Sequence, residues 1–270
     1  MERLRDFLVE DAPAGDVTSE ALVPEGIDAS ASVTSGGKGI LAGAEEAAWL
    51  FRDGGLEAEV LIPDGGRLSP GDAVMRVAGD LRQILLRERT CLNIMMVMSG
   101  TATETSLILD SCRKANPSIK LAATRKTLPG LRRLQKKAVT LGGGEPHRDT
   151  LSHHILVKDN HIQAAGGMAK VLELLEDHRD GMIEIEAENI EEALLVARWG
   201  ADVVMLDNMS PAEAEHCYLR VKEINPDIIV EVSGGIGPAE APLYANSADR
   251  ISMGHLTHSS PSLQFSLHLD

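Results

Sequence analysis

The run Val203-Val204-Met205-Leu206-Asp207 places four apolar residues directly before a carboxylate. Such a run is typical of a strand that is buried on both faces, as the strands of a parallel sheet are. Five other segments repeat the pattern, each an expected strand followed by a polar residue or a glycine. The six expected strands are 120–124, 154–157, 182–185, 203–206, 228–232 and 251–253, and the residues that mark their ends are Lys126, Lys158, Glu186, Asp207, Ser233 and Gly254.

The end markers recur at intervals of 21 to 32 residues, which is the length of one strand-loop-helix unit. Repeated units of this kind, with functional groups at the C-terminal ends of the strands, describe an α/β barrel. Six strands are fewer than the eight of a complete barrel, so we predict an open, incomplete α/β barrel. A doubly wound open sheet is the alternative fold.

The first hundred residues follow a different pattern. Short β-prone runs at 31–34, 59–62 and 73–77 are separated by an expected helix at 44–52 and by turns, which indicates an α+β domain. A long helical pattern begins at Leu81, and Ser99-Gly100 interrupts it. We therefore place the domain boundary near this interruption, with one domain at 1–101 and the barrel at 102–257.

The composition argues against several classes of function. The chain has 270 residues, a formal net charge of -15 and only 3% aromatic residues, which does not favour nucleic-acid binding. No apolar run reaches the length of a membrane span, and the N-terminus lacks a signal-peptide pattern, so we expect a soluble, cytoplasmic protein. The three cysteines, Cys91, Cys112 and Cys217, form no CxxC pair and are expected to be reduced thiols.

Cations gather after the expected strands despite the negative net charge. Arg125 and Lys126 follow the first strand, Lys158 follows the second, and His147-Arg148 comes soon after three consecutive glycines. Clustered ionised side chains cost free energy unless a ligand or partner neutralises them. We therefore predict a binding site for anions at this end of the barrel. Arg133 and Lys136 lie further along the chain, on what reads as the solvated face of a helix.

Carboxylates and glycines follow the later strands. Glu184, Glu186 and Glu188 alternate and should point to one side, with Glu186 nearest the mouth of the barrel. Glu186 and Asp207 could hold Mg²⁺ or sugar hydroxyls, although salt bridges to nearby cations are the alternative. The small residues Ser233, Gly234, Gly235 and Gly254 leave backbone N–H groups bare where barrels often bind phosphate. The site thus suits a phosphorylated sugar and an anionic second substrate.

Two groups of histidines allow more than one interpretation. A zinc site made by His147, His161 and a carboxylate is conceivable, but the spacing of these residues does not require it. His153-His154 reads as a pair at the surface or at a strand edge.

Taken together in this order, the motifs resemble the quinolinate phosphoribosyltransferase family, and the resemblance spans almost the whole chain. The motifs are Glu10-Asp11 with Gly15-Asp16-Val17-Thr18, Glu88-Arg89-Thr90-Cys91-Leu92-Asn93 with Ser99-Gly100, Thr124-Arg125-Lys126-Thr127, Lys158-Asp159-Asn160-His161, Leu206-Asp207-Asn208-Met209, Ser233-Gly234-Gly235-Ile236 and Gly254-His255-Leu256-Thr257-His258-Ser259.

The resemblance implies a pentosyltransferase of NAD biosynthesis. Such an enzyme transfers the phosphoribosyl group of phosphoribosyl pyrophosphate to quinolinate and releases CO₂ and pyrophosphate, so that nicotinate mononucleotide forms. The resemblance also implies an N-terminal α/β sandwich, joined by the C-terminal tail 258–270 and packed on an open barrel. It further implies Mg²⁺ as cofactor and a homodimer or hexamer in which Arg89 reaches the neighbouring subunit's site.

The family's functional residues carry over onto matching positions. By the resemblance, Arg89, Arg125, His147, Arg148 and Lys158 would meet the carboxylates of quinolinate. Lys126 and Lys158 would serve phosphoribosyl pyrophosphate, and Glu186 and Asp207 would hold ribose hydroxyls and Mg²⁺, so these four are the expected catalytic residues. The 5′-phosphate would bind at Ser233, Gly234, Gly235 and Gly254.

Two positions depart from the family pattern. Pro146 stands where the family usually has Asn, and Thr150-Leu151 replaces the usual Gly-Leu. A proline before His-Arg is similar to the ModD-like proteins found with molybdate transport, although the Lys-Asp-Asn-His motif that they tend to lack is intact here. Two alternatives therefore stay open: a phosphoribosyltransferase for another acidic heterocycle, and a phosphometabolite-binding protein without catalysis.

Overall fold

The computed structural model describes residues 2–270, and the chain divides into two compact units. One unit contains the residues up to Ser106 together with 140–142 and Ser260–Asp270, and the other contains Leu107–Val139 and Gly143–Ser259. The division falls inside one long helix, a few residues beyond the position expected from the sequence. None of the helices among residues 2–270 is both long and apolar enough to span a bilayer.

Helix α4 (Leu81–Arg113) is continuous, so the predicted interruption at Ser99-Gly100 is wrong. The Ser99 hydroxyl donates a hydrogen bond to the Ala42 carbonyl (3.0 Å) and accepts one from the Ala42 N–H (2.9 Å). A Cβ atom at Gly100 would lie 2.1 Å from the carbonyl oxygen of Pro261. These small residues therefore allow other segments to approach the helix closely, and they do not end it.

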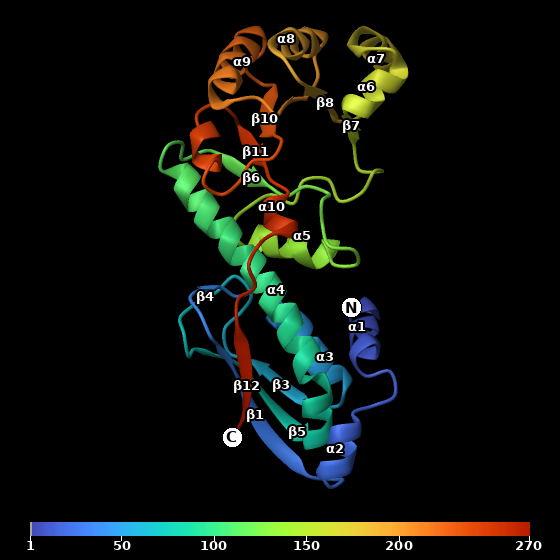
Figure 1. The fold of residues 1–270 in the computed structure, drawn as a ribbon, viewed down its shortest axis with the longest axis vertical. Helices are drawn as coiled ribbons and strands as arrows, with labels where there is room; N and C mark the ends of the chain where they lie inside the picture. Colours follow the sequence, from blue (N-terminus) through green and yellow to red (C-terminus); the bar gives the residue numbers. More distant parts are fainter. Residues whose placement is uncertain (1) are drawn as a thin grey trace. The chain divides into compact units, whose positions relative to one another are not determined.

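The first unit is built on an antiparallel sheet with strand order β12-β1-β5-β3 (Figure 1). The chain's last strand, β12, pairs with β1, so the C-terminal residues belong to the N-terminal unit. The strands of the unit are β1 (Asp28–Ser35), β2 (Gly39–Ile40), β3 (Glu57–Val60), β4 (Arg67–Leu68), β5 (Ala73–Asp80) and β12 (Phe265–Leu269), and its helices besides α4 are α1 (Glu2–Asp11), α2 (Val17–Leu22) and α3 (Ala44–Asp53).

The second unit contains a parallel sheet of six strands in the order β6-β11-β10-β9-β8-β7. Strands β7 to β11 lie side by side in sequence order, and β6 pairs with β11. The first two strands of the unit, β6 and β7, therefore do not pair with each other, as in a barrel that is left open between them. A doubly wound sheet would instead reverse its order partway. The predicted open α/β barrel is therefore confirmed. The strands are β6 (Lys120–Ala122), β7 (Ile155–Val157), β8 (Ile183–Ala187), β9 (Val203–Asp207), β10 (Ile229–Ser233) and β11 (Arg250–Ser252).

The two faces of this sheet differ in chemistry. Alternate residues such as Ile185, Val204 and Val232 form an apolar core together with residues of the covering helices. Val203 and Met205 on β9 are apolar, but several other residues between them are polar or charged and yet buried: Glu184, Glu186, Glu231, Arg250 and Ser252. The helices of the unit are α5 (Arg132–Leu141), α6 (Asp159–Ala165), α7 (Met168–Leu175), α8 (Ile190–Trp199), α9 (Pro211–Ile224) and α10 (His255–His258), with short 3₁₀ turns η1 (Glu176–His178) and η2 (Ala241–Tyr244).

Local capping fixes where the chain leaves the central strands. The Asn189 side chain accepts the Glu192 N–H at the start of α8. Ser210 and Glu213 form a reciprocal capping box at the start of α9, where Pro211 occupies the first turn. These caps hold the short connections after β8 and β9 and so position the ends of both strands.

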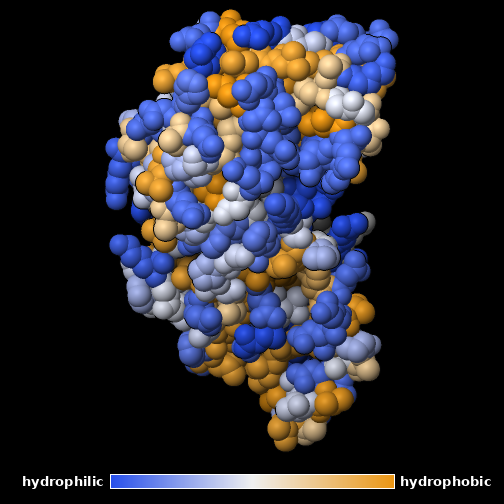
Figure 2. Space-filling view, turned by 45° about the horizontal axis from the view of Figure 1, so that its top comes forward, coloured by the Kyte–Doolittle hydropathy of each residue, from blue (hydrophilic) through white to orange (hydrophobic). Residues whose placement is uncertain are grey.

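The surface is mixed in character. Hydrophilic residues cover much of the face seen in Figure 2, and hydrophobic residues lie between them. The exposed large apolar side chains come from many different elements, including Val17, Leu107, Leu195 and Leu219. Scattered apolar residues of this kind are normal on a folded protein and need no partner to explain them.

Candidate active site

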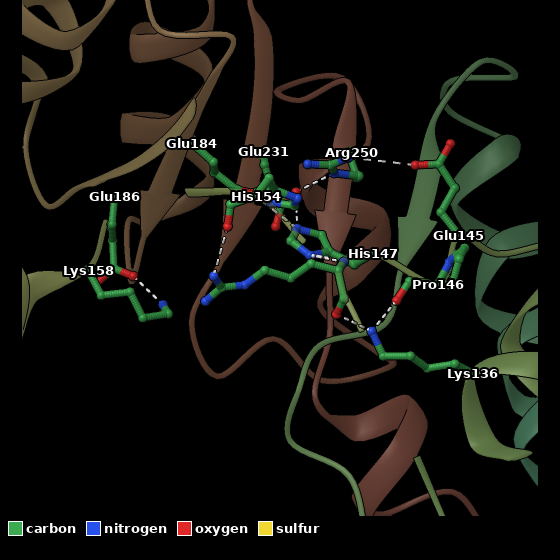
Figure 3. A network of polar contacts seen from close by, with 11 residues as sticks. Lys136, Glu145, Pro146, His147, His154, Lys158, Glu184, Glu186, Glu231 and Arg250 are labelled. Carbon is green, nitrogen blue, oxygen red and sulfur yellow. Dashed lines mark hydrogen bonds and ion pairs between the residues drawn. The ribbon is translucent and has the colours of Figure 1, made fainter. Parts of the chain in front are cut away.

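Lys158 and Glu186 form an ion pair at the C-terminal ends of the adjacent strands β7 and β8 (Figure 3). The Lys158 ammonium group donates a hydrogen bond to Oε2 of Glu186. Oε1 of Glu186 lies 3.5 Å from the N–H group of Asp159 at the start of α6. The Glu186 side chain is 5% exposed and that of Lys158 is 44% exposed, so the pair extends from the barrel interior into solvent.

Asp207 ends the next strand and lies within the electrostatic reach of the same pair. Burial and the neighbouring Glu186 charge raise the pKa of Asp207, and the charges of Lys158 and Lys126 partly oppose this. The side-chain amide of Asn208 donates a 2.5 Å hydrogen bond to Asp207. Two carboxylates and two ammonium groups therefore share one mouth of the barrel. The carboxylate oxygens of Glu186 and Asp207 are the ligand type that Mg²⁺ prefers.

The loops after β9 and β10 interlock. Gly234 has φ +96°, and a Cβ atom there would lie 2.4 Å from the side-chain oxygen of Asn208. Asn208 itself has φ +55° and donates its N–H to the Ser233 carbonyl (3.1 Å). A Cβ atom at Gly235 would meet nothing within 4 Å. The space beside Gly235 is thus open, whereas Asn208 fills the space beside Gly234, and a larger residue cannot replace Gly234 without strain.

Gly254 brings the loops after β6 and β11 together. A Cβ atom at Gly254 would lie 2.8 Å from Nε2 of His258 and 3.1 Å from Cδ of Lys126. The Lys126 side chain therefore lies directly against the glycine that precedes α10. This places the predicted cation of one strand end beside the predicted phosphate-binding segment of another.

His147 lies inside the barrel, against two carboxylates. Its Nε2 atom is 3.3 Å from Glu184 on β8 and 3.4 Å from Glu231 on β10. The His147 side chain is 6% exposed, and both carboxylates are fully buried. Burial opposes the charged ring, but the two close carboxylates of Glu184 and Glu231 outweigh it and raise the pKa of His147 to about 9.

The same buried network includes Arg250 and His154 (Figure 3). Arg250 on β11 donates to Glu231 and lies 3.7 Å from Glu145. Nε2 of His154 is 3.2 Å from Glu184, and burial lowers the pKa of this histidine. His153 is exposed, and His154 directly precedes the edge strand β7, in agreement with the predicted surface or strand-edge pair. The His154 side chain nevertheless points into the network.

The structure does not favour a zinc site here. Nδ1 of His161 accepts the Lys158 N–H (2.9 Å) and caps its own helix, so His161 does not join His147. His147, His154 and Glu184 do lie close enough to share one ion. Nδ1 of His147, however, accepts the Arg148 N–H (2.8 Å), which places the proton of the neutral ring on Nε2. Nε2 lies at ion-pair distance from both carboxylates, so within residues 2–270 His147 pairs with Glu184 and Glu231.

Arg125 and Arg148 supply cations beside this network. The Nε atom of Arg125 is buried and makes no hydrogen bond within residues 2–270. Burial and the nearby Arg125 charge lower the pKa of Arg148, whose guanidinium donates to the His154 carbonyl (3.3 Å). Two close guanidinium groups, one of them with an unpaired buried donor, are suited to binding an anion.

Lys136 is not solvated, contrary to the sequence prediction. Its side chain is 3% exposed, and its ammonium group donates to the carbonyls of Pro146 (2.5 Å) and Arg148. Burial lowers its pKa, and Asp149 at 3.5 Å partly opposes this. The neighbouring Arg133 is exposed, as expected.

Arg89 belongs to the other compact unit, as part of α4. Its side chain is 57% exposed and lies 3.9 Å from Glu88. The other predicted site residues all belong to the barrel unit.

The sequence prediction did not include Glu231, Arg250, Gln135 or Lys136 in the site. A signal for the first two does exist in the chain. Charged residues that alternate with apolar ones inside buried strands, as in Ile229–Ser233 and Arg250–Ser252, indicate a polar barrel interior. Glu188 was expected to share this side, but β8 ends at Ala187 and Glu188 is exposed.

The fold and the site define a two-domain α/β-barrel protein that gathers cations, carboxylates and glycines at the C-terminal ends of its strands. Residues 101–268 match the sequence model of the quinolinate phosphoribosyl transferase C-terminal domain, and residues 16–99 match that of the N-terminal domain. The chain therefore belongs to the quinolinate phosphoribosyl transferase family.

Individual relatives agree along the whole chain. The probable nicotinate-nucleotide pyrophosphorylase (carboxylating) of Methanothermobacter thermautotrophicus is 38% identical over 274 residues, which cover 100% of this chain and 98% of that protein. The human nicotinate-nucleotide pyrophosphorylase (carboxylating) is 35% identical over 266 residues, 97% of this chain and 89% of that protein. The crystal structure of NadC from Streptococcus pyogenes superposes with a TM-score of 0.91 at 32% identity and covers 100% of this chain and 95% of that chain.

Proposed function

We propose that this protein transfers the phosphoribosyl group of phosphoribosyl pyrophosphate to quinolinate, with loss of CO₂ and pyrophosphate, to give nicotinate mononucleotide. The family membership supports the reaction. The observation that carries it at the site is the gathering of Lys126, Lys158, Glu186 and Asp207 around one barrel mouth. A heavily anionic leaving group needs the two ammonium groups, and a developing positive charge on ribose needs the two carboxylates.

Arg125 and Arg148 are proposed to bind the carboxylates of quinolinate. The unpaired buried Nε of Arg125 supports this role, because a buried donor without a partner is costly until a ligand accepts from it. His147 and Lys158 complete this subsite in the proposal. The fully buried Glu184 and Glu231 offset part of the positive charge, so the cations can stay clustered before the substrate binds.

The proposed reaction proceeds in two stages at these residues. The ring nitrogen of quinolinate forms a bond to C1′ of ribose as the bond from C1′ to the pyrophosphate oxygen breaks. Lys126 and Lys158 neutralise the departing pyrophosphate, and Glu186 or Asp207 stabilises the positive charge on the sugar. The bond from the ring to the 2-carboxylate then breaks, the carboxylate leaves as CO₂, and the electron pair that remains at ring carbon 2 takes a proton.

Mg²⁺ belongs to the proposal, with Glu186 and Asp207 as the residues that would hold it, directly or through water. When bound, the ion supplies positive charge that neutralises pyrophosphate. The raised pKa of Asp207 supports this role, since a buried carboxylate beside another carboxylate is stabilised by a cation.

The 5′-phosphate is proposed to bind at Ser233, Gly234, Gly235 and Gly254. The open space beside Gly235 and the positive φ of both adjacent glycines support this assignment. A cytoplasmic location and a homodimer or hexamer, with Arg89 contributed by the neighbouring subunit, are further parts of the proposal.

The direct experiment incubates the purified protein with quinolinate, phosphoribosyl pyrophosphate and Mg²⁺ and looks for nicotinate mononucleotide by mass spectrometry. Formation of this product at a rate proportional to enzyme concentration supports the proposal. If product forms only with another pyridine carboxylate from a tested panel, the substrate assignment is wrong. Binding of both substrates by calorimetry without any release of pyrophosphate would contradict catalysis.

A further inference from the structure

Two buried neighbours on helix α5, Gln135 and Lys136, face two different loops of the barrel unit. Their relative exposures are 2% and 3%. One loop follows β6 and carries Arg125 and Lys126, and the other precedes β7 and carries His147 and Arg148. Both side chains form hydrogen bonds with backbone atoms of these loops; Gln135 also contacts the backbone of α10, and Lys136 also lies 3.5 Å from the Asp149 carboxylate. Helix α5 therefore holds the course of the chain there.

Gln135 connects the first loop to helix α10. Its Oε1 atom accepts the Leu128 N–H (3.0 Å), and its Nε2 atom donates to the Thr257 carbonyl. The Thr257 hydroxyl in turn donates to the Lys126 carbonyl (2.7 Å). The chain of contacts thus joins the backbone of Lys126 to the helix that begins directly after Gly254. Both segments belong to the proposed subsite for phosphoribosyl pyrophosphate.

Lys136 holds the second loop on both sides of His147. Its ammonium group donates to the carbonyls of Pro146 and Arg148, the two residues that flank this histidine (Figure 3). His147 has φ +54°, a left-handed conformation that costs free energy and persists only where the surroundings hold it. A buried cation on the adjacent carbonyls provides such a hold, and it also fixes where the Arg148 side chain starts.

We propose that Gln135 and Lys136 are positioning residues, Gln135 for the subsite of phosphoribosyl pyrophosphate and Lys136 for the subsite of the pyridine base. This inference rests on the proposed function. Neither residue is placed against a substrate; each acts through the loop it holds. Displacing a reacting group by about 1 Å can cost on the order of 10²-fold in rate, so such loops need firm support.

The test compares Lys136→Met with Gln135→Leu, since both keep the approximate size of the side chain. We expect Lys136→Met to raise KM for quinolinate by about tenfold or more, because the two carbonyls that flank His147 lose their charge-assisted hydrogen bonds and one such bond already has about that effect. KM for phosphoribosyl pyrophosphate should stay within about twofold. Gln135→Leu should instead raise KM for phosphoribosyl pyrophosphate and leave KM for quinolinate within about twofold. Arg133→Met, which removes an exposed cation from the same helix, is the matched control and should change neither constant.

Chemical rescue separates the ammonium group from general packing. In Lys136→Ala, added propylammonium can replace the missing methylene groups and the charge, and should lower KM for quinolinate again. Propanol of similar size should not. Rescue by both compounds, or by neither, in a folded variant overturns the assignment of Lys136.

A rise of both Michaelis constants in both variants would show general damage to α5 and overturn the inference. If Gln135→Leu does not fold, Thr257→Val tests the proposed role of Gln135 in its place. Thr257→Ser is the conservative variant that keeps the hydroxyl. An unchanged KM for phosphoribosyl pyrophosphate in Thr257→Val would contradict the proposal that Gln135 and Thr257 position the Lys126 backbone. Failure of the wild-type protein to form nicotinate mononucleotide would instead refute the proposed function, so the two failures are distinguishable.

Discussion

The ammonium group of Lys158 donates a hydrogen bond to the carboxylate of Glu186, and the two residues end adjacent parallel strands. The pair lies where the barrel interior opens, with Asp207 on the next strand. In the proposed reaction this position suits two tasks, in which Lys158 would turn to an anionic substrate and Glu186 would face the ribose.

We expect Lys158→Met and Glu186→Gln each to lower kcat/KM by on the order of 10²-fold or more, because each removes a charge aimed at the transition state. The double variant should lose less than the product of the two effects, since the partners are in contact. Steady-state kinetics of the four proteins measure this coupling. Strictly multiplicative effects would contradict a shared catalytic role.

Arg125→Ala should lower kcat/KM for quinolinate by about 10²- to 10⁴-fold, because two charge-assisted hydrogen bonds of about 1.5–3 kcal/mol each would be lost. The unpaired Nε atom of Arg125 indicates that the fold itself does not depend on this group. Thermal melting should therefore stay close to that of the wild type. Near-normal turnover in this variant would refute the base-binding site.

Asp207→Asn should make the protein more stable and less active at neutral pH. Burial and Glu186 raise the pKa of Asp207, so ionising this group costs more in the folded than in the unfolded state. The wild type therefore loses stability as pH rises through the pKa of Asp207, and the neutral variant does not. Chemical denaturation at pH 7 and at about pH 3 measures the difference, which should vanish at the lower pH. A destabilised variant at pH 7 would show that the lysines outweigh the burial.

His147 should make stability depend on pH in the alkaline range. Its pKa is raised to about 9 from an ordinary value near 6.5, so its contribution is fully present below pH 6.5 and is lost as pH rises through about 9. The contribution is on the order of 3 kcal/mol from a shift of this size. We expect the difference in unfolding free energy between the wild type and His147→Gln to shrink between pH 6.5 and pH 9.5. A difference that is constant over this range would mean that the ring stays neutral.

Arg89 is predicted to complete the site of a neighbouring subunit. Arg89→Ala and Lys158→Ala should each be nearly inactive, and mixing them should restore part of the activity, because some sites in mixed oligomers contain both native residues. Native mass spectrometry provides the control that subunits have exchanged. Exchange without recovery would count against a shared site.

The barrel could be predicted from the sequence because each of its strands is indicated by a run of a few consecutive residues. An apolar run such as Val203–Asp207 forms a buried strand almost wherever it occurs, and the residue that ends it falls at the mouth of the barrel. For this reason the strand pattern alone is enough to group Lys158, Glu186 and Asp207 at one end of the sheet. The turn at Gly234 and Gly235 could be predicted for the same reason, since the positive φ values there suit a residue without Cβ.

The features that could not be predicted from the sequence depend on contacts between segments that are distant along the chain. Lys136 has the sequence surroundings of an exposed lysine, and it is buried because two loop carbonyls ten and twelve residues away face it. The contact of His147 with Glu184 and Glu231 likewise arises from the curvature of the sheet, which brings β8 and β10 toward one ring. The Ser99-Gly100 pair looks like a helix end, yet its role is to admit Ala42 and Pro261.

The decisive test of the proposed reaction uses quinolinate labelled with ¹⁴C in its 2-carboxylate, together with phosphoribosyl pyrophosphate and Mg²⁺. We predict that labelled CO₂, pyrophosphate and nicotinate mononucleotide appear in equal amounts, and that nicotinate, which lacks the 2-carboxylate, releases no pyrophosphate under the same conditions. Pyrophosphate release without labelled CO₂, or equal turnover of nicotinate, would contradict it.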